Sequence, residues 1–344
     1  MMKFIKSMIV ILMCAWNTSF AMVQPPSIVN AEYVQPSAFD PLKPNQKIGN
    51  LFQRNQSGPY VLQRLTQHTY FFEREFYATT FYVGEEGVLV FDPLDRHGKY
   101  LLEAIRKVTS LPVTAIVYSH AHFDHIADAD YFVAEAKKQG TPLRIIASQA
   151  TTDKLKRINT KLPLPNESIA WPNGKFKFED LTVELHGFKH AAHTDDHAAW
   201  LLIEEKVLHA PDHMNPDQLP FWRFGGSENY VYYPHNLKET YALDWVYLNA
   251  GHGNVGSHKD YDFYFAYLHD LENAVTHAMN GTPWGEGVNP AKINTHAAYF
   301  VTWYNRVAEK AVAELRKKYG KYYGFEYTAH SNAEMVLGVL SQYK

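Results

Sequence analysis

Short apolar runs, each followed by turn-forming residues, occupy the middle of the chain. They are rich in β-branched and aromatic residues, which favour strands. The runs that we predict as single strands are 69–72, 80–83, 88–91, 113–118, 143–147 and 246–250. Two longer segments, 175–185 and 199–210, have the pattern of hairpins. The segment Gly84-Glu85-Glu86-Gly87 favours a hairpin turn between two of the single strands.

Apolar residues at helical spacing lie between and after these runs. Residues 100–108 have this spacing, and a second helix is expected near 129–138, closed by Gly140. The tail is predicted to be helical from about Lys259, with an apolar stripe over 300–315. We expect this tail to pack on the main domain, although a dimer arm or a wall of a substrate pocket has the same pattern.

The composition is that of a globular protein, with 46% apolar and 20% charged residues among 344. This length suits one large domain or two smaller ones. Lys+Arg number 33 and Asp+Glu 36, which gives a formal charge of −3. Because the basic residues form no cluster, a nucleic-acid partner is not expected. A single cysteine excludes a disulfide framework and a cysteine-based zinc site. The sequence leaves the oligomeric state open.

The first 21 residues have the parts of a secretory signal peptide. Lys3 and Lys6 precede nine apolar residues, 8–16, and Ser19 and Ala21 supply the small residues before a cleavage site. Nine is far short of the roughly 20 apolar residues that span a bilayer. We therefore expect cleavage after Ala21 and a soluble periplasmic or secreted protein without a membrane partner. The mature chain would have 31 basic and 36 acidic residues, a formal charge of −5, and no cysteine.

A proline-rich segment, 22–58, follows the signal peptide. It has few pairs of apolar residues and five prolines. These features are typical of an irregular arm on the surface or of a partly disordered leader.

The strongest chemical signal is His120-Ala-His122-Phe-Asp124-His125, directly after the predicted strand 113–118. Three imidazoles and a carboxylate within six residues are hard to explain as packing. Neutral imidazole and carboxylate oxygen are ligands that suit zinc. In an extended segment, His120 and His122 project to the same side, and the two residues past the bend can turn toward a second metal ion.

Three later segments carry the same residue types near predicted strands. They are His193-Thr194, Asp212 at the end of a strand, and Gly251-His252-Gly253. Glycines on both sides of a histidine allow the backbone to turn tightly and place the ring in a cleft. Because sites form where several strand ends meet, these segments are expected to converge on the first cluster.

These features, in this order, resemble the metallo-β-lactamase superfamily. The resemblance covers about residues 60–271. It implies an α+β fold, a four-layer αββα sandwich with a dinuclear metal site at one edge, to which the tail pattern adds a helical C-terminal extension. Together with the patterns above, the expected organisation is a signal peptide at 1–21, a Pro-rich arm at 22–58, a metallo-β-lactamase-like domain at 59–275 and the extension at 276–344.

The resemblance also implies ligands for two zinc ions per chain. The expected ligands are His120, His122 and His193 for the first ion, Asp124, His125 and His252 for the second, and Asp212 between them. Iron and manganese accept overlapping ligands, so the residue types leave the metal open.

The implied chemistry is hydrolysis of an ester-, lactone- or amide-like bond in a small molecule by a hydroxide held by the metal ions. Asp124 would ligate metal, orient the nucleophile and pass a proton to the leaving group. β-Lactam hydrolysis is an alternative, although β-lactamases of this family usually have cysteine or serine where this chain has Asp212. Further alternatives are an alkyl sulfatase or phosphodiesterase, a mononuclear iron oxygenase of the same fold, and a non-catalytic metal-stabilised binding protein.

The segment 219–233 is aromatic and contains two glycines. We expect it to cap an apolar substrate, with Trp222 and Tyr230 shaping the pocket and Arg223 available for a carboxylate. Packing of these rings against the C-terminal helices is equally consistent with the pattern. Histidines that flank the ligands are expected to support them or to lie on the surface, with substrate contact or ligation as alternatives. They are His190, His197, His209 and His213.

Overall fold

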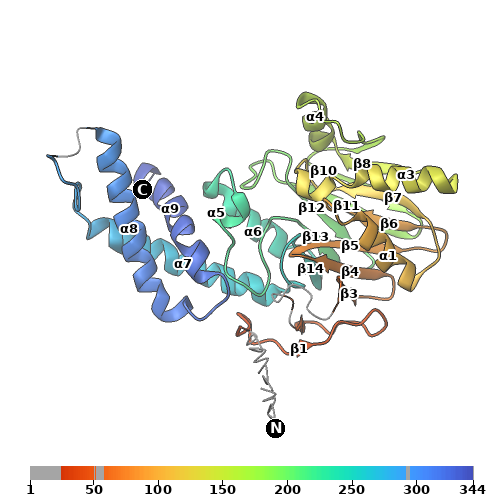
Figure 1. Cartoon of the computed structure of the whole chain (residues 1–344), viewed down its shortest axis with the longest axis horizontal. Helices are drawn as coiled ribbons and strands as arrows, with labels where there is room; N and C mark the ends of the chain where they lie inside the picture. The colour runs from red at the N-terminus through yellow and green to blue at the C-terminus, as the bar shows by residue number, and fades with distance from the viewer. Residues whose placement is uncertain (1–24, 50, 52–57, 292–294, 344) are drawn as a thin grey trace, which may run out of the picture.

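The structure is a computed structural model that describes residues 25–49, 51, 58–291 and 295–343. Two β-sheets pack face to face at one end of the molecule, and long helices extend from them to the other end (Figure 1). The expected signal peptide, 1–21, lies outside the described residues. No helix in the described part of the chain combines the length and apolarity needed to cross a membrane.

The first sheet has seven strands in sequence order. They are β3 (Val61–Arg64), β4 (Thr69–Arg74), β5 (Tyr77–Val83), β6 (Val88–Phe91), β7 (Val113–Tyr118), β8 (Arg144–Ser148) and β9 (Glu167–Ile169). Pairing is antiparallel from β3 to β6 and parallel from β6 to β9. The carboxyl ends of β6 and β7 therefore lie at the same edge of the sheet.

The second sheet has five strands, again in sequence order. They are β10 (Asn173–Phe178), β11 (Leu181–Gly187), β12 (Ala198–Leu202), β13 (Val207–His209) and β14 (Tyr247–Asn249). The last two pair in parallel, so their carboxyl ends also lie together.

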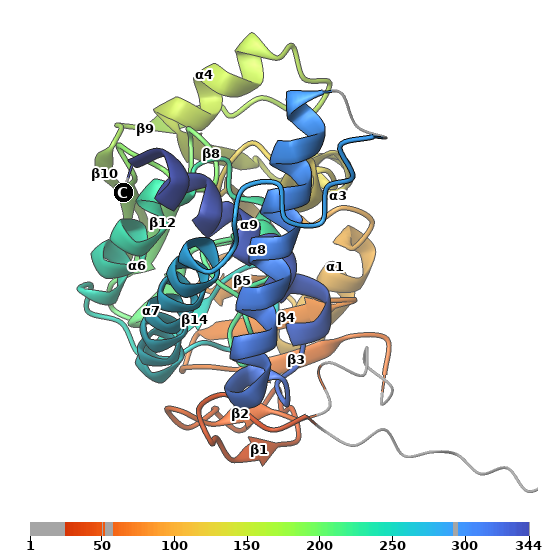
Figure 2. The same ribbon diagram turned by 90° about the vertical axis from the view of Figure 1, so that its left-hand side faces the viewer.

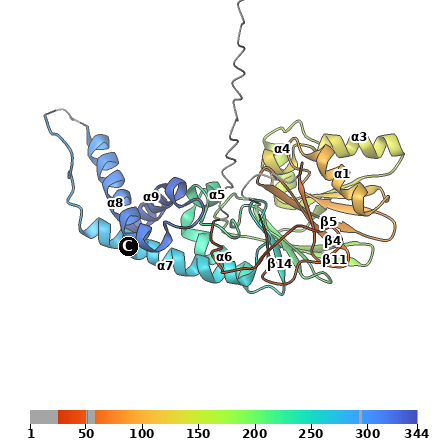
Figure 3. The same ribbon diagram turned by 60° about the horizontal axis from the view of Figure 1, so that its bottom comes forward.

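Helices cover the outer faces of both sheets, and the last of them form an extension that leads away from the sheets (Figure 1). They are α1 (Gly98–Val108), α2 (Phe123–Ile126), α3 (Ala129–Gln139), α4 (Gln149–Arg157), α5 (Arg223–Gly226), the 3-10 helix η2 (Tyr230–Tyr232), α6 (Tyr233–Tyr241), α7 (His258–Asn280), α8 (His296–Tyr319) and α9 (Phe325–Tyr343). Figure 2 shows α8 crossing in front of the molecule beside α7 and α9, and Figure 3 shows α7 leading away from the sheets to these two helices.

Three apolar cores hold these layers together. The core between the sheets includes Phe91 and Trp200, both fully buried. A second core joins the outer face of the seven-stranded sheet to α1 and α3, through residues such as Leu101 and Phe132. The third joins the five-stranded sheet to the C-terminal helices and includes Leu248. The four-layer αββα sandwich with a helical C-terminal region is therefore confirmed.

Most predicted elements are present, with small shifts at their ends. The strands 88–91 and 113–118 have the predicted bounds, and Gly140 closes α3 in a left-handed conformation with φ of 68°. Helix α4 was not predicted, although Ser148 caps it by accepting a hydrogen bond from the Thr151 N–H. The expected domain boundary at residue 275 falls inside α7.

The described part of the N-terminal arm packs on the domain. Its two short strands, β1 (Tyr33–Val34) and β2 (Lys47–Ile48), pair in parallel. The Lys47 ammonium lies 2.6 Å from the Asp260 carboxylate in α7, and both side chains are fully buried. This ion pair fixes the arm to the start of α7.

Candidate metal centre

The seven predicted ligands meet at one edge of the sandwich. The first four follow β7, His193 lies between β11 and β12, Asp212 follows β13, and His252 follows β14. The structure places them in two groups, and within each group the candidate ligand atoms lie within 4.8 Å of one another. The two groups are His120, His122, His193 and Asp212, and Asp124, His125 and His252.

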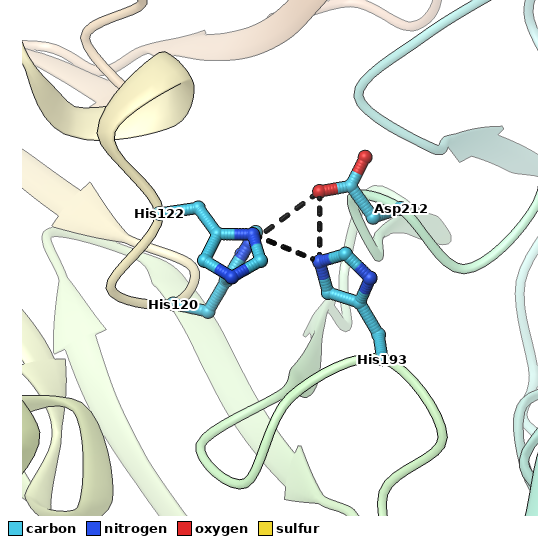
Figure 4. Close-up of side chains that lie close together, drawn as sticks. All are labelled: His120, His122, His193 and Asp212. Carbon is cyan, nitrogen blue, oxygen red and sulfur yellow. Dashed lines mark hydrogen bonds and ion pairs between the residues drawn. The ribbon is translucent and has the colours of Figure 1, made fainter. Parts of the chain in front are cut away.

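The first group is compact, and all of its members except the half-buried His122 are buried. The Nε2 atom of His193 lies 3.0 Å from Nδ1 of His122. The Oδ2 atom of Asp212 lies 3.1 Å from Nε2 of His193 and 3.4 Å from Nε2 of His120. Figure 4 shows the three rings and the carboxylate converging on one small volume.

The second group shares Asp212 with the first. Nε2 of His125 lies 3.5 Å from Oδ2 of Asp124, and Nε2 of His252 lies 3.8 Å from the same oxygen. Nε2 of His125 also lies 3.0 Å from Oδ2 of Asp212, whose other oxygen lies 3.0 Å from Nε2 of His252. The two oxygens of Asp212 therefore face histidines of both groups.

The backbone at these positions is unusual because the ligands must converge. Asp212 has φ of 59°, a left-handed conformation that costs a residue with a Cβ about 1–3 kcal/mol. Gly251 has φ of 78°, and a Cβ there would lie 2.9 Å from the Cε1 atom of His125. A side chain at Gly251 would therefore displace a ligand. This is the physical reason for the glycine before His252.

The donor set fits a transition-metal ion. Nε2 of His120 and Nε2 of His125 are buried, and each faces the Asp212 carboxylate without a hydrogen bond of good geometry among the described residues. Such nitrogen atoms are costly to bury unless they bind something. Imidazole nitrogen and carboxylate oxygen together suit zinc, and iron and manganese accept the same ligand types.

The electrostatics also favour a cation. Burial and the neighbouring His120 lower the pKa of His122 to about 3, which keeps the ring in the neutral form that binds metal. Burial disfavours the charged form of His125, but the carboxylates of Asp212 and Asp92 outweigh burial and raise its pKa well above the usual range. The site therefore attracts positive charge, which a metal ion can supply in place of a proton.

Residues 74–252 match the family model of the metallo-beta-lactamase superfamily. This range is more than half of the chain and includes both ligand groups. The protein belongs to the metallo-β-lactamase superfamily. The resemblance seen in the sequence is therefore confirmed at the level of the superfamily.

Two kinds of relative are similar to this metallo-β-lactamase superfamily protein. The linear primary-alkylsulfatase of Pseudomonas sp. (strain ATCC 19151) is 36% identical over 73 residues, which span 20% of this chain and 14% of that relative. A metallo-beta-lactamase from Pontibacter korlensis has a TM-score of 0.51 and 15% identity, covering 61% of this chain and 99% of the other. The metallo-beta-lactamase DIM-1 has a TM-score of 0.49 and 15% identity, covering 61% and 96%. At these identities the likeness to solved structures shows the fold alone.

Asp92 contacts the candidate metal centre, and sequence analysis did not predict this role. It directly follows β6 and is fully buried. Its Oδ2 atom lies 3.0 Å from Nε2 of His209 and 3.4 Å from Nδ1 of His125, and its Oδ1 accepts a hydrogen bond from the Ser119 N–H. Asp92 thus contacts the ring nitrogen of His125 that does not face Asp212. Its place directly after a predicted strand was the one available signal.

Other contacts orient the remaining rings. The Nδ1 atom of His252 donates to the Phe76 carbonyl at 2.9 Å, and Nδ1 of His120 lies 2.9 Å from the Ser119 hydroxyl. Each contact occupies one ring nitrogen and leaves the other for the metal.

The flanking histidines belong to neither ligand group. His197 is buried, and its Nε2 donates to the Pro211 carbonyl at 2.7 Å. His213 lies 2.6 Å from the Thr240 hydroxyl, and His190 is exposed. His209 contacts Asp92 as described. His197, His209 and His213 therefore make contacts next to the candidate metal centre, and His190 lies on the surface.

The predicted pocket residues separate into two environments. Trp222 is 52% exposed, and Arg223 is also exposed. Tyr230 is only 4% exposed, and its ring packs at 4.7 Å from Phe224 and 6.2 Å from Tyr233. The structure thus brings the first two side chains to the surface and places Tyr230 in the helical core behind them.

Proposed function

We propose that the protein is an exported hydrolase that binds two zinc ions and cleaves an ester-, lactone- or amide-like bond in a small molecule. The observation that carries the proposal is the position of Asp212, whose two oxygens face histidines of both groups at 3.0–3.4 Å. One carboxylate with this arrangement suits a pair of metal ions. Export is proposed from the signal-peptide pattern of residues 1–21.

The residues of the site would bind the two ions in two sets. His120, His122 and His193 would hold one ion, Asp124, His125 and His252 the other, and Asp212 both. Zinc bound in this way would lower the pKa of coordinated water to about 7 and would polarise the bond to be cleaved.

Asp124 is suited to proton transfer. Its side chain is 39% exposed, whereas that of Asp212 is 8% exposed. Asp124 is therefore the carboxylate of the two groups that an incoming substrate can reach. We assign it the orientation of the attacking water and delivery of a proton to the leaving group.

Metal analysis and turnover of the purified chain test the proposal together. Zinc-loaded protein is expected to bind two ions and to hydrolyse at least one of p-nitrophenyl butyrate, an aliphatic lactone or a chromogenic cephalosporin, and chelation should abolish this activity. Asp212→Asn should lose turnover and bind fewer than two ions. Asp195→Asn is the matched control, because Asp195 lies two residues from His193 with its side chain 65% exposed and belongs to neither group. Two tightly bound ions in Asp212→Asn, or fewer than two in the unmodified chain, would contradict the proposal.

A sulfate ester of a primary alcohol is the second candidate substrate. The 73-residue similarity to a linear primary-alkylsulfatase favours it. Phe123, beside Asp124, is 63% exposed and offers an apolar surface for an alkyl chain. Sulfate release from octyl sulfate, followed by ion chromatography, tests this candidate. Carboxylic ester hydrolysis without sulfate release would reject it.

A further inference from the structure

A left-handed turn lies in the segment after Asp212. Four successive residues have positive φ, namely Arg223 (49°), Phe224 (53°), Gly225 (74°) and Gly226 (73°). Glycine adopts this conformation readily, but arginine and phenylalanine do not. Contacts from elsewhere must therefore impose it on the first two residues.

These contacts come from α9, in the C-terminal helices. Asn332 is fully buried, and its side-chain amide donates to the Pro220 carbonyl at 2.9 Å. Its side-chain carbonyl accepts a hydrogen bond from the Phe224 N–H at 3.1 Å. The neighbouring Ser331 hydroxyl accepts from the Arg223 N–H at 3.3 Å. One helix thus fixes the start of the turn by three hydrogen bonds.

The turn lies against two segments that carry metal ligands. A Cβ at Gly225 would be 3.0 Å from the backbone oxygen of Asp212. Directly after the turn, the Glu228 N–H donates to the carbonyl of His193 at 3.2 Å. If the turn shifted, its position relative to Asp212 and His193 would therefore change.

The Arg223 guanidinium is unpaired among the described residues. It contacts only the Trp222 ring, at 5.5 Å, and is exposed. The other described arginines pair with carboxylates, except Arg64, which donates to three backbone carbonyls. A strained turn that presents an unpaired arginine, and whose backbone lies against the segments of two candidate metal ligands, suits recognition of an anion.

We propose that Asn332 is a positioning residue, which holds the turn so that Arg223 binds an anionic group of the substrate distant from the bond that is cleaved. This inference rests on the proposed hydrolase function and specifies its substrate class. The C-terminal helices are then part of the substrate site.

A pair of esters that differ by one charge tests the proposal. Mono-p-nitrophenyl glutarate carries a carboxylate, and p-nitrophenyl butyrate is a neutral ester with the same leaving group. Arg223→Met is expected to raise KM for the anionic ester about tenfold and to change kcat/KM for the neutral ester much less, because the neutral ester offers the guanidinium no charged partner. Arg106→Met is the control, because Arg106 is exposed on α1, in the opposite outer layer.

Asn332→Asp tests the positioning role. Aspartate keeps the acceptor for Phe224 but cannot donate to the Pro220 carbonyl. We expect KM for the anionic ester to rise at least threefold, and kcat/KM for the neutral ester to fall by a smaller factor. A purely structural role would lower activity on both esters equally, and that result would overturn the assignment of Asn332.

Failure of the proposed function is distinguishable from failure of this inference. If neither ester is hydrolysed, calorimetric binding of the same two esters to the zinc-loaded protein replaces kinetics. Tighter binding of the anionic ester that Arg223→Met abolishes would support the inference and reject ester hydrolysis. Equal affinity of the unmodified chain and Arg223→Met for the anionic ester would overturn the inference.

Discussion

Replacement of Lys47 by methionine removes the charge that anchors the N-terminal arm. The Lys47 ammonium lies 2.6 Å from both the Asp260 carboxylate and the Val255 carbonyl, and its side chain has no exposure to solvent. Methionine has a similar length and fills the same space. The variant therefore leaves the buried Asp260 without its counter-charge and otherwise changes the packing little.

The size of the effect follows from what Asp260 retains. Breaking a buried ion pair by removal of one partner costs about 3–5 kcal/mol. Asp260 still accepts hydrogen bonds from the Ser257 N–H at 2.8 Å, the Ser257 hydroxyl at 2.7 Å and the Asp217 N–H at 2.8 Å. These bonds partly compensate the charge, so we expect the lower end of the range, about 3 kcal/mol. For a protein of this size, such a loss lowers Tm by roughly 4 °C.

Urea unfolding and thermal melting of the zinc-loaded protein measure this loss. Lys43→Met is the control, because Lys43 is in the same arm and is exposed. The double variant Lys47→Met/Asp260→Asn should recover part of the loss, since it removes the uncompensated charge. A fall in unfolding free energy below about 1 kcal/mol for Lys47→Met, or one equal to that of Lys43→Met, would refute the reasoning.

Three further predictions concern the site. Asp92→Asn should weaken zinc binding in the second group 10–100-fold, because His125 loses its orienting carboxylate; a competition titration against a chromophoric chelator that finds unchanged affinity would contradict this. Gly251→Ala should lower both Tm and metal content, since its Cβ would lie 2.9 Å from His125, and wild-type values for both would disprove it. Burial and the nearby His193 lower the pKa of His213 to about 3. Below the unfolded pKa near 6.5, His213 takes up a proton in the unfolded state but not in the folded state. The free energy of unfolding is therefore undiminished above this pH and falls by about 2 kcal/mol by pH 5. His213→Gln should reduce the loss of unfolding free energy between pH 7.5 and 5, and an equal loss in both proteins would exclude this role.

Local patterns predicted most of the strands, and the residues predicted as ligands lie close together in the structure. The strands 88–91 and 113–118 are short β-branched runs, and their ends coincide with the structure. The His120–His125 box concentrates ligand residue types within six positions, so its chemistry is visible without tertiary information.

The parts that sequence analysis missed depend on distant contacts. Asp92 is a lone carboxylate in the sequence, and its role arises only where β6 meets His209 across the two sheets. The Lys47–Asp260 pair joins residues 213 positions apart. The left-handed turn contradicts the local preference of Arg223 and is imposed by α9, which is more than 100 residues away. No periodicity or motif records such pairings.

Because the ligands come from both sheets, the stability of the protein should depend on the supply of metal. The box from His120 to His125 follows a strand of the seven-stranded sheet, whereas Asp212 and His252 follow strands of the five-stranded sheet. Bound ions would therefore join the two halves of the sandwich. By mass action, an ion present at 1,000 times its dissociation constant adds about 4 kcal/mol to folding stability. We therefore expect zinc scarcity to increase proteolytic loss of the protein, so that its abundance follows the metal content of its surroundings.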